Sequence, residues 1–186
     1  MKPHKQKPYY SVNEYGYTQG FTTAEKSMPT EGSATYQGVA FTHNKQGKLN
    51  YTVNFSTKEG EGKITELTDI GTITLEKGSF GKHYNNHYMS GVGNVVAEDW
   101  KNDNVTGKYS FEFYGPKAEE IAGKVTLTQD KNYYGTPNPA YTPEGNEPMY
   151  FESKKLRDVA TENAQYGYNT ESFDIGFGGS RGEIKK

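Results

Sequence analysis

The sequence predicts an all-β protein: an eight-stranded antiparallel up-and-down β-barrel with a short N-terminal arm and a long insertion before the last strand. The first observation is the segment Gly47–Leu67, where apolar and polar residues alternate strictly from Leu49 to Ser56. Alternation of this kind is the period of a strand with one buried face. The second is composition, because 14% of the residues are aromatic and the chain holds 16 tyrosines and 22 glycines. Such a mixture suits a twisted sheet better than a helical bundle.

Eight short runs of β-forming residues, separated by turn residues, account for the predicted strands. They are ATYQGVAF (34–41), KLNYTVNFS (48–56), GKITEL (62–67), GTITLE (71–76), YMSGVGNVVA (88–97), GKYSFEFY (107–114), EIAGKVTLTQ (120–129) and SFDIGFG (172–178). Eight is the smallest number of strands that commonly closes into an antiparallel barrel filled by side chains, and closure removes exposed sheet edges.

The apolar members of these runs are expected to point into the barrel. They are Leu49, Tyr51, Val53, Phe55, Ile73, Leu75, Tyr109, Phe111, Phe113, Val125, Leu127, Phe173, Ile175 and Phe177. Gly91, Gly93 and Gly123 are expected at tight bends, where a side chain would collide with the opposite wall. Residues 116–120 read Pro-Lys-Ala-Glu-Glu and predict one helical turn, because proline suits the first helical position and glutamate suits a helix N-terminus.

The domain organisation follows from the same pattern. Residues 1–30 are polar and tyrosine-rich without a sustained period, so we expect a loose arm with at most one added strand. Residues 31–182 form one barrel domain, a size that suits a single core. Residues 130–170 interrupt the barrel with four prolines and six tyrosines, and loops of this length are usually functional or disordered. Within them, residues 153–160 fit a short helix.

Composition and charge exclude several classes of protein. The net charge is −2 and both signs are mixed along the chain, so no basic stripe supports nucleic-acid binding. The chain has no cysteine, which excludes disulfides, thiolate chemistry and cysteine-based zinc sites. Mean hydropathy is −0.96, and no apolar run is long enough for a helix to span a bilayer.

Catalytic and metal-binding signals are weak. No nucleophile motif is present, and the side chains of the neighbouring Glu119 and Glu120 would diverge on a helical turn. His83 and His87, with the adjacent tyrosines, form a weak candidate ligand pair for a transition metal or haem iron. We place them in a loop between strands without carboxylate or cysteine partners, where solvated histidines are the favoured interpretation. The sequence therefore predicts a protein that is not an enzyme and has no cofactor.

Several stretches, in the same order, resemble the family of the meningococcal factor H binding protein and transferrin-binding protein B, surface lipoproteins of Gram-negative pathogens. They are GSATYQGVAF, GKLNYTVNFSTKEGEGKI, NNHYMSGVG, GKYSFEFYGPKAEEIAG and DIGFGGSR. The resemblance runs from Gly32 to Leu127 and resumes at Phe173. It implies the C-terminal barrel of that family. Residues 130–170 have no counterpart in the factor H binding protein, so no individual partner-binding residue is carried over.

The resemblance also implies a function. It predicts a surface-exposed lipoprotein of the outer membrane that binds a host serum protein, with a complement regulator as the favoured partner and immune evasion as the purpose. Binding of haem, haemoglobin or transferrin for iron acquisition is the alternative. We expect a monomer that contacts the membrane through a lipid anchor. The signal peptide and the lipidated cysteine would then precede Met1. Met1 is either the start of a shortened chain, which the resemblance favours, or a true cytoplasmic start.

Residues 130–170 are the expected partner-binding surface. Tyrosine offers a large and stiff amphipathic area at little entropic cost, which is why binding surfaces use it. The alternative is that these tyrosines seal the open end of the barrel. The candidate binding residues are Tyr133, Tyr134, Tyr141, Tyr150, Phe151, Lys154, Lys155 and Arg157.

Overall fold

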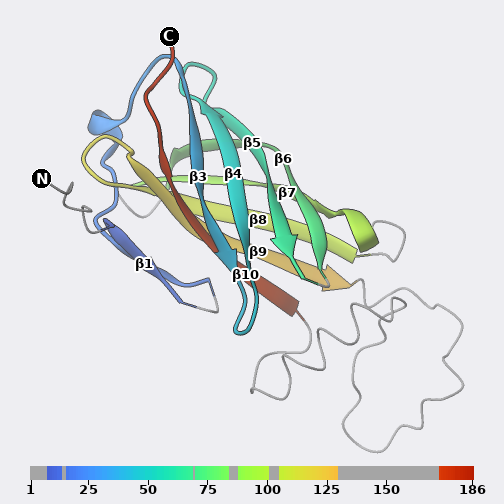
Figure 1. Ribbon diagram of the computed structural model, residues 1–186. Coiled ribbons are helices and arrows are strands. Elements are labelled where there is room, and N and C mark those ends of the chain that lie inside the picture. The colour runs from blue at the N-terminus through green and yellow to red at the C-terminus, as the bar shows by residue number, and fades with distance from the viewer. Residues whose placement is uncertain (1–7, 14–15, 69, 84–87, 101–104, 130–171) are drawn as a thin grey trace, which may run out of the picture.

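A computed structural model describes residues 8–13, 16–68, 70–83, 88–100, 105–129 and 172–186 (Figure 1). Eight strands form a closed antiparallel barrel in which each strand pairs with its neighbours and the last strand pairs with the first. They are β3 Ser33–Phe41, β4 Gln46–Asn54, β5 Glu59–Leu67, β6 Gly71–Lys82, β7 Met89–Ala97, β8 Val105–Tyr114, β9 Glu120–Gln129 and β10 Ser172–Arg181. The predicted fold class is confirmed. Within the described residues, no helix has the length and apolarity to cross a membrane.

The predicted inward-facing set is also confirmed, since all of its members are buried. Aromatic rings fill the barrel and contact one another edge to face. The Phe80 and Phe113 ring centroids lie 5.0 Å apart, those of Phe111 and Phe113 5.2 Å apart, and those of Tyr51 and Phe111 5.1 Å apart. Such pairs add to the stability that comes from burying apolar area. The barrel is therefore a rigid body with a filled interior.

Strand β6 is longer than predicted because it contains an irregularity. Its pairing with β7 shifts register between Leu75 and Ser79, and both Glu76 and Lys77 are exposed. A bulge adds a residue to one strand and breaks the period of two. The alternation that predicts the strand therefore stops at residue 76, although the strand continues to Lys82.

A buried tyrosine pair stabilises this bulge. The Tyr109 hydroxyl donates to the Glu76 carbonyl oxygen at 2.7 Å and lies 3.0 Å from the Tyr51 hydroxyl. Burial raises the pKa of both tyrosines, so both hydroxyls keep their protons. The bulge removes the Glu76 carbonyl from the regular pairing between strands, and the Tyr109 hydroxyl supplies the hydrogen bond that a buried backbone carbonyl needs.

The three predicted close-packed glycines are found in the barrel, but they pack against a different neighbour. A Cβ at Gly91 would lie 2.3 Å from the ring of Phe111, and one at Gly93 would lie 2.4 Å from the ring of Tyr109. A Cβ at Gly123 would lie 2.0 Å from the carbonyl oxygen of Ser110. All three partners belong to β8, the adjacent strand, and not to the opposite wall. The expectation of a collision across the barrel was wrong.

The connection from β8 to β9 corrects a second prediction. Residues 115–118 form a turn without helix, and Glu120 already belongs to β9. Ala118 has a positive φ of 57°, a conformation that ends a turn and does not continue a helix. Proline at 116 and glutamate at 119 therefore serve a tight strand-to-strand turn, whose Glu119 carboxylate accepts from the Lys117 backbone N–H at 2.7 Å.

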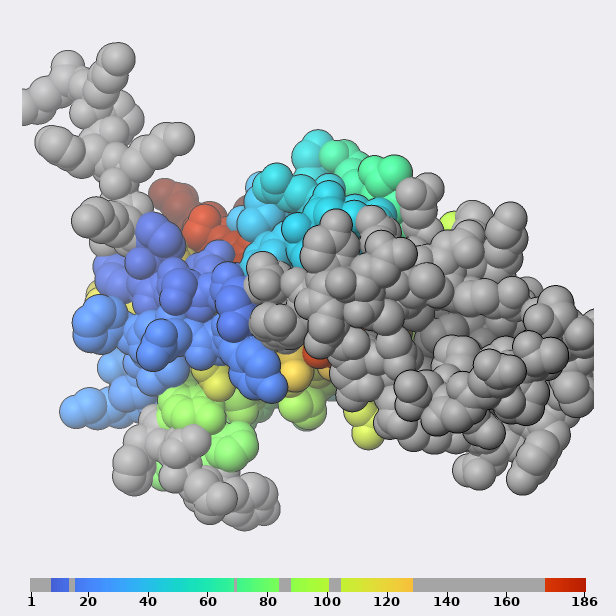
Figure 2. Space-filling model, turned by 90° about the horizontal axis from the view of Figure 1, so that it is seen from below, coloured from blue at the N-terminus to red at the C-terminus, as the bar shows by residue number. Residues whose placement is uncertain are grey.

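The described part of the N-terminal arm, residues 8–13 and 16–30, packs on the barrel, in contrast to the loose arm that was predicted. Two short strands, β1 Tyr10–Val12 and β2 Thr18–Gly20, form an antiparallel hairpin, and the 3₁₀ turn η1 Glu25–Ser27 follows. Two strands are present where at most one was expected. The hairpin lies outside the barrel (Figure 1), beside its yellow and orange wall strands in Figure 2.

Outward-facing small residues explain why the arm docks at this place. The ring of Tyr10 lies against Gly178, and its centroid is 5.7 Å from that of Tyr114. Tyr114 and Ala122 both point outward from the wall but are buried beneath the arm. Burial, with the Glu120 carboxylate nearby, raises the pKa of Tyr10 to about 12. The arm thus covers an apolar strip of β8, β9 and β10 that the alternating pattern does not reveal.

Candidate partner-binding surfaces

The predicted partner-binding residues lie outside the described part of the chain. They are Tyr133, Tyr134, Tyr141, Tyr150, Phe151, Lys154, Lys155 and Arg157. Their role stays a prediction. The described strands do establish where their segment is attached. Thr128 of β9 pairs with Ser172 of β10, so the two ends of residues 130–171 leave from adjacent positions at one rim of the barrel.

This rim, where β3, β5, β7 and β9 end, is closed by a second 3₁₀ turn, η2 Glu98–Trp100. The side chain of Trp100 is completely buried and packs in the same core as Leu67 and Ile70. The Thr74 hydroxyl donates to the Glu98 carboxylate at 2.8 Å and ties the turn to β6. A rim fixed in this way is a firm base for a long segment, and loops on rigid scaffolds commonly carry recognition.

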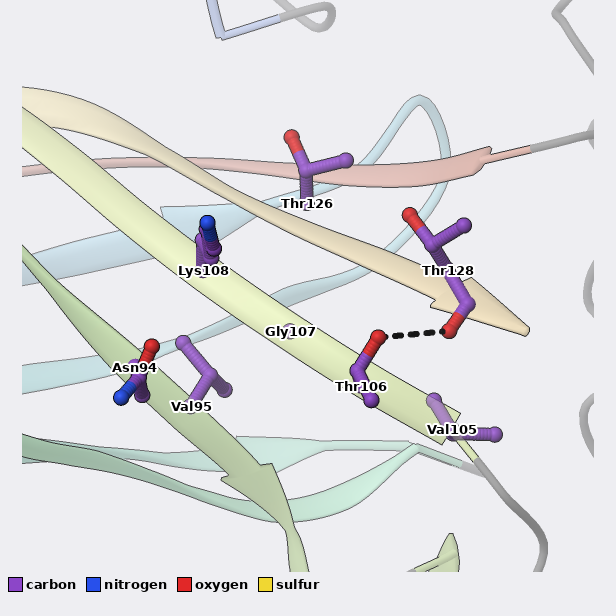
Figure 3. A pocket seen from close by; sticks show the side chains of 8 residues that line it. All are labelled: Asn94, Val95, Val105, Thr106, Gly107, Lys108, Thr126 and Thr128. Atoms are coloured by element: carbon purple, nitrogen blue, oxygen red, sulfur yellow. Dashed lines mark hydrogen bonds between the residues drawn. The ribbon is translucent and has the colours of Figure 1, made fainter. Parts of the chain in front are cut away.

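A hollow of about 610 Å³ lies on the barrel wall over β7, β8 and β9 (Figure 3). Hydroxyl, amide and ammonium groups and two valines line it, in contributions from three strands. The lining residues are Asn94, Val95, Val105, Thr106, Gly107, Lys108, Thr126 and Thr128. Because Val105 begins β8 and Thr128 precedes the last residue of β9, the hollow reaches the rim from which residues 130–171 leave.

The hollow offers hydrogen bonds and one positive charge. The Thr106 hydroxyl makes only a long bond of 3.4 Å to the Thr128 carbonyl oxygen, and the Thr126 hydroxyl donates to the Asp174 carboxylate at 2.6 Å. The Asn94 and Lys108 side chains are exposed. Groups of this kind can bind the polar surface of a partner by hydrogen bonding. Sequence reasoning missed the hollow, because threonine and lysine at alternate strand positions are ordinary solvent-facing residues.

Two exposed aromatic side chains on the arm form another candidate surface. Phe21 is 80% exposed and Tyr17 is 68% exposed. The Lys124 ammonium lies 5.2 Å from the centre of the Tyr17 ring, a cation–π contact that holds this ring against β9. Exposed aromatic rings are enriched at protein interfaces, and nothing in the local sequence distinguishes Phe21 from the buried aromatics.

The structure describes one member of the predicted histidine pair. His83 follows β6, and its ring stacks on that of Tyr88 with centroids 5.4 Å apart and an angle of 15°. The His83 backbone N–H donates to the Tyr88 carbonyl oxygen at 3.1 Å, so these residues face each other across the end of a hairpin. His87 lies outside the described residues, and the pairing of the two imidazoles as ligands stays a prediction.

Haemin titration tests this pair. We expect the purified protein to be colourless and to bind haemin weakly or not at all, because two histidines in a hairpin connection, without carboxylate or cysteine partners, are a weak ligand set. The measurement is the absorption spectrum during titration with haemin. A sharp Soret band that His87→Ala abolishes would contradict the expectation and would favour the iron-acquisition alternative.

Comparison with known proteins places the barrel in a family. The family model described as "Factor H binding protein, C-terminal" matches residues 26–125. Transferrin-binding protein B of Neisseria meningitidis serogroup B is 30% identical over 142 residues, which cover 64% of this chain and 20% of that protein. Transferrin-binding protein B of Haemophilus influenzae is 25% identical over 171 residues, which cover 77% of this chain and 27% of that protein.

The chain therefore spans only about a fifth to a quarter of the length of these curated relatives. A solved structure of a transferrin-binding protein B variant from Haemophilus parasuis Hp5 matches 89% of this chain and 30% of its own, at 17% identity and a TM-score of 0.47. The family model covers more than half of the chain, from η1 through most of β9. The chain belongs to the family of the factor H binding protein C-terminal domain.

Proposed function

We propose that this protein is a surface lipoprotein of a Gram-negative bacterium, that it binds a host serum protein, and that it has no enzymatic activity. The observation that carries the proposal is the family match, which falls on the strands of the closed barrel from β3 to β9. A barrel whose interior is filled by its own side chains presents its walls, rims and loops to a partner. Lipid anchoring at the outer membrane and a monomeric state are parts of the same proposal.

Residues 130–171 are the proposed partner-binding segment, with the hollow beside their point of attachment as part of the same surface. The support is geometric. The segment leaves and re-enters the barrel at paired positions, and the hollow reaches the same rim. The sequence of the segment concentrates tyrosines together with Lys154, Lys155 and Arg157. Aromatic and arginine side chains dominate the binding energy of many interfaces.

A complement regulator is the first candidate partner, because the matching family model carries the name of a factor H binding protein. Transferrin is the second, because the curated relatives reported above are transferrin-binding proteins. Pull-down from a panel of mammalian sera on the immobilised protein, followed by titration with purified factor H and with purified transferrin, separates the two. Failure to retain any serum protein would contradict the proposed function.

Deletion of the segment is the direct test of where the partner binds. Thr128 pairs with Ser172, so the register of β9 and β10 allows a short hairpin connection between these two strands. Replacing residues 130–170 by Asn-Gly would join them with a two-residue hairpin loop of the favoured type I′. We expect the shortened protein to melt cooperatively and to lose binding of the serum protein that the full chain retains.

Within the full chain, Tyr141→Ala or Tyr150→Ala is expected to weaken binding of that serum protein about thirtyfold if that residue is a central anchor.

Two controls make the deletion informative. Far-ultraviolet circular dichroism and thermal melting check that the barrel persists without the segment. Phe21→Ala, which removes an exposed ring on the arm, tests the other surface and is expected to leave affinity unchanged. A folded deletion variant with unaltered affinity would contradict the assignment of the partner-binding site to residues 130–171. If Phe21→Ala also loses binding, the two results together would place the partner-binding site on the arm.

A further inference from the structure

A second hollow, of about 420 Å³, lies at the end of the barrel strands opposite the rim to which residues 130–171 are attached. The η1 turn, the β8–β9 turn, the end of β10 and the C-terminal residues contribute to it. Its lining combines three cationic side chains with apolar ones and contains no carboxylate. The lining residues are Lys26, Ser27, Met28, Pro29, Pro116, Lys117, Arg181 and Ile184.

Arg181 is held in place by backbone oxygens. Its Nε donates to the Ala118 carbonyl at 3.0 Å, its Nη2 to the Lys117 carbonyl at 3.0 Å and its Nη1 to the Gly182 carbonyl at 3.1 Å. The Ala118 carbonyl also accepts from the buried Tyr36 hydroxyl at 2.7 Å, which ties this contact to the core. A guanidinium has five N–H donors, so two remain available. The side chain is thus fixed, and its charge is not neutralised by a carboxylate among the described residues.

The two lysines of the hollow are also without ion-pair partners in the described part of the chain. Two acidic side chains close to the hollow in sequence pair with other lysines: Glu25 pairs with Lys82 at 3.4 Å, and Glu31 pairs with Lys186 at 2.5 Å. Glu183, between Arg181 and Ile184 in the sequence, is exposed and does not line the hollow. The Glu119 carboxylate folds back onto the backbone of its own turn. Three positive charges from three separate elements therefore converge on one hollow without a matching negative charge in its lining.

We propose that this hollow binds an oxyanion, a phosphate or a carboxylate, carried on a body with an apolar face. The fixed guanidinium supplies planar donors that match the geometry of such anions, and the lysines supply mobile point charges. Met28, Pro29 and Ile184 are half-buried and form an apolar surface beside the charges. Bound anion would neutralise charges that repel one another in its absence.

This inference is independent of the proposed function. Strand β9 begins at Glu120, next to the β8–β9 turn, and ends at Gln129. The length of the barrel therefore separates the hollow from the point where residues 130–171 are attached. The oxyanion can belong to a soluble molecule or to a lipid headgroup, since both present the same group. Deletion of residues 130–170 is accordingly expected to leave binding at this hollow unchanged.

The site is tested by titrating the protein with phenyl phosphate. Isothermal titration calorimetry and amide chemical shifts both monitor the binding. We expect saturable binding at millimolar concentrations, weaker binding of inorganic phosphate and none of phenol. Lys26→Gln and Lys117→Gln are each expected to lower the affinity for phenyl phosphate about tenfold, the usual scale of a lost charge-assisted contact. Neither ammonium group supports the fold, so both variants should retain the melting temperature of the parent. Lys63→Gln, at an exposed position of β5, is the matched control and should bind like the parent.

Vesicles separate the two sources of the anion. Binding to phosphatidylcholine vesicles that contain phosphatidic acid, and not to phosphatidylcholine alone, would indicate a headgroup. Binding of phenyl phosphate without binding to either vesicle would indicate a soluble ligand, and both results support the site. The proposal is overturned if phenyl phosphate fails to bind at millimolar concentrations. It is equally overturned if Lys63→Gln weakens binding as much as Lys26→Gln and Lys117→Gln do.

Discussion

Phe111→Ala is expected to lower the free energy of unfolding by about 3–5 kcal/mol, the range for truncation of a buried aromatic side chain. Phe111 is 3% exposed, and its ring contacts those of Tyr51 and Phe113. The ring also covers Gly91 of the neighbouring strand. Glycine has no side chain that can relax into the space, so the variant would keep most of the cavity. Chemical denaturation measures the loss.

A double-mutant cycle with Gly91 makes this prediction specific. In the parent, Gly91→Ala would place a Cβ 2.3 Å from the Phe111 ring and should destabilise the barrel by overpacking. In the Phe111→Ala background the same change has room and should cost little, so the two effects are not additive. Val92→Ala, at a 57% exposed position of the same strand, is the surface control. A loss of less than about 1 kcal/mol for Phe111→Ala would show that the side chain is not part of the core.

Gly123→Ala is expected to cost at least about 3 kcal/mol, at the upper end of overpacking effects. The added Cβ would lie 2.0 Å from the Ser110 carbonyl oxygen and 2.6 Å from the Phe111 Cα. Both atoms belong to the backbone of β8, which pairs with β9 at this position. A flexible side chain can move aside, but a paired backbone cannot do so without breaking its hydrogen bonds. The barrel is therefore expected to lose stability or to open between these strands.

Gly81→Ala is the matched comparison for Gly123→Ala. It also replaces a strand glycine by alanine, but a Cβ at Gly81 has nothing within 4 Å. We expect a small gain in stability of about 0.5 kcal/mol, because alanine restricts the unfolded chain more than glycine does. Thermal and chemical unfolding of the two variants measure the difference. Equal effects at the two positions would contradict the account based on close backbone approach.

The two tyrosines at the β6 bulge show the limit of pattern reading. The period of two placed Tyr51 and Tyr109 inside the barrel, and both are buried. The pattern gives no information on what their hydroxyls bind. The hydrogen-bond partner of Tyr109 depends on the register shift in β6, where the Glu76 carbonyl oxygen lies 2.7 Å from the Tyr109 hydroxyl. A bulge changes pairing between strands that are distant in sequence, so it leaves little trace in the local alternation.

The candidate binding sites also differ in how much of each could be predicted from the sequence. Sequence pattern marked residues 130–170 as an interruption of the barrel, and their role as a binding surface stays a prediction. Pattern reading found neither hollow. Lys26, Lys117 and Arg181 meet only because the sheet closes and brings the η1 turn, the β8–β9 turn and the end of β10 to one rim. Each residue taken alone is an ordinary surface cation.

Sequence by itself determined the eight barrel strands, apart from the second half of β6, with their buried faces and the closed barrel. Alternation is a local property that burial of one face imposes on each strand. Tertiary structure decided the docking of the arm, the left-handed turn at Ala118 and the neighbours of the glycines. These features depend on which backbones approach one another once the barrel is closed. Outward positions such as Ala122 and Gly178 look solvent-facing in the sequence, and only the packed arm buries them.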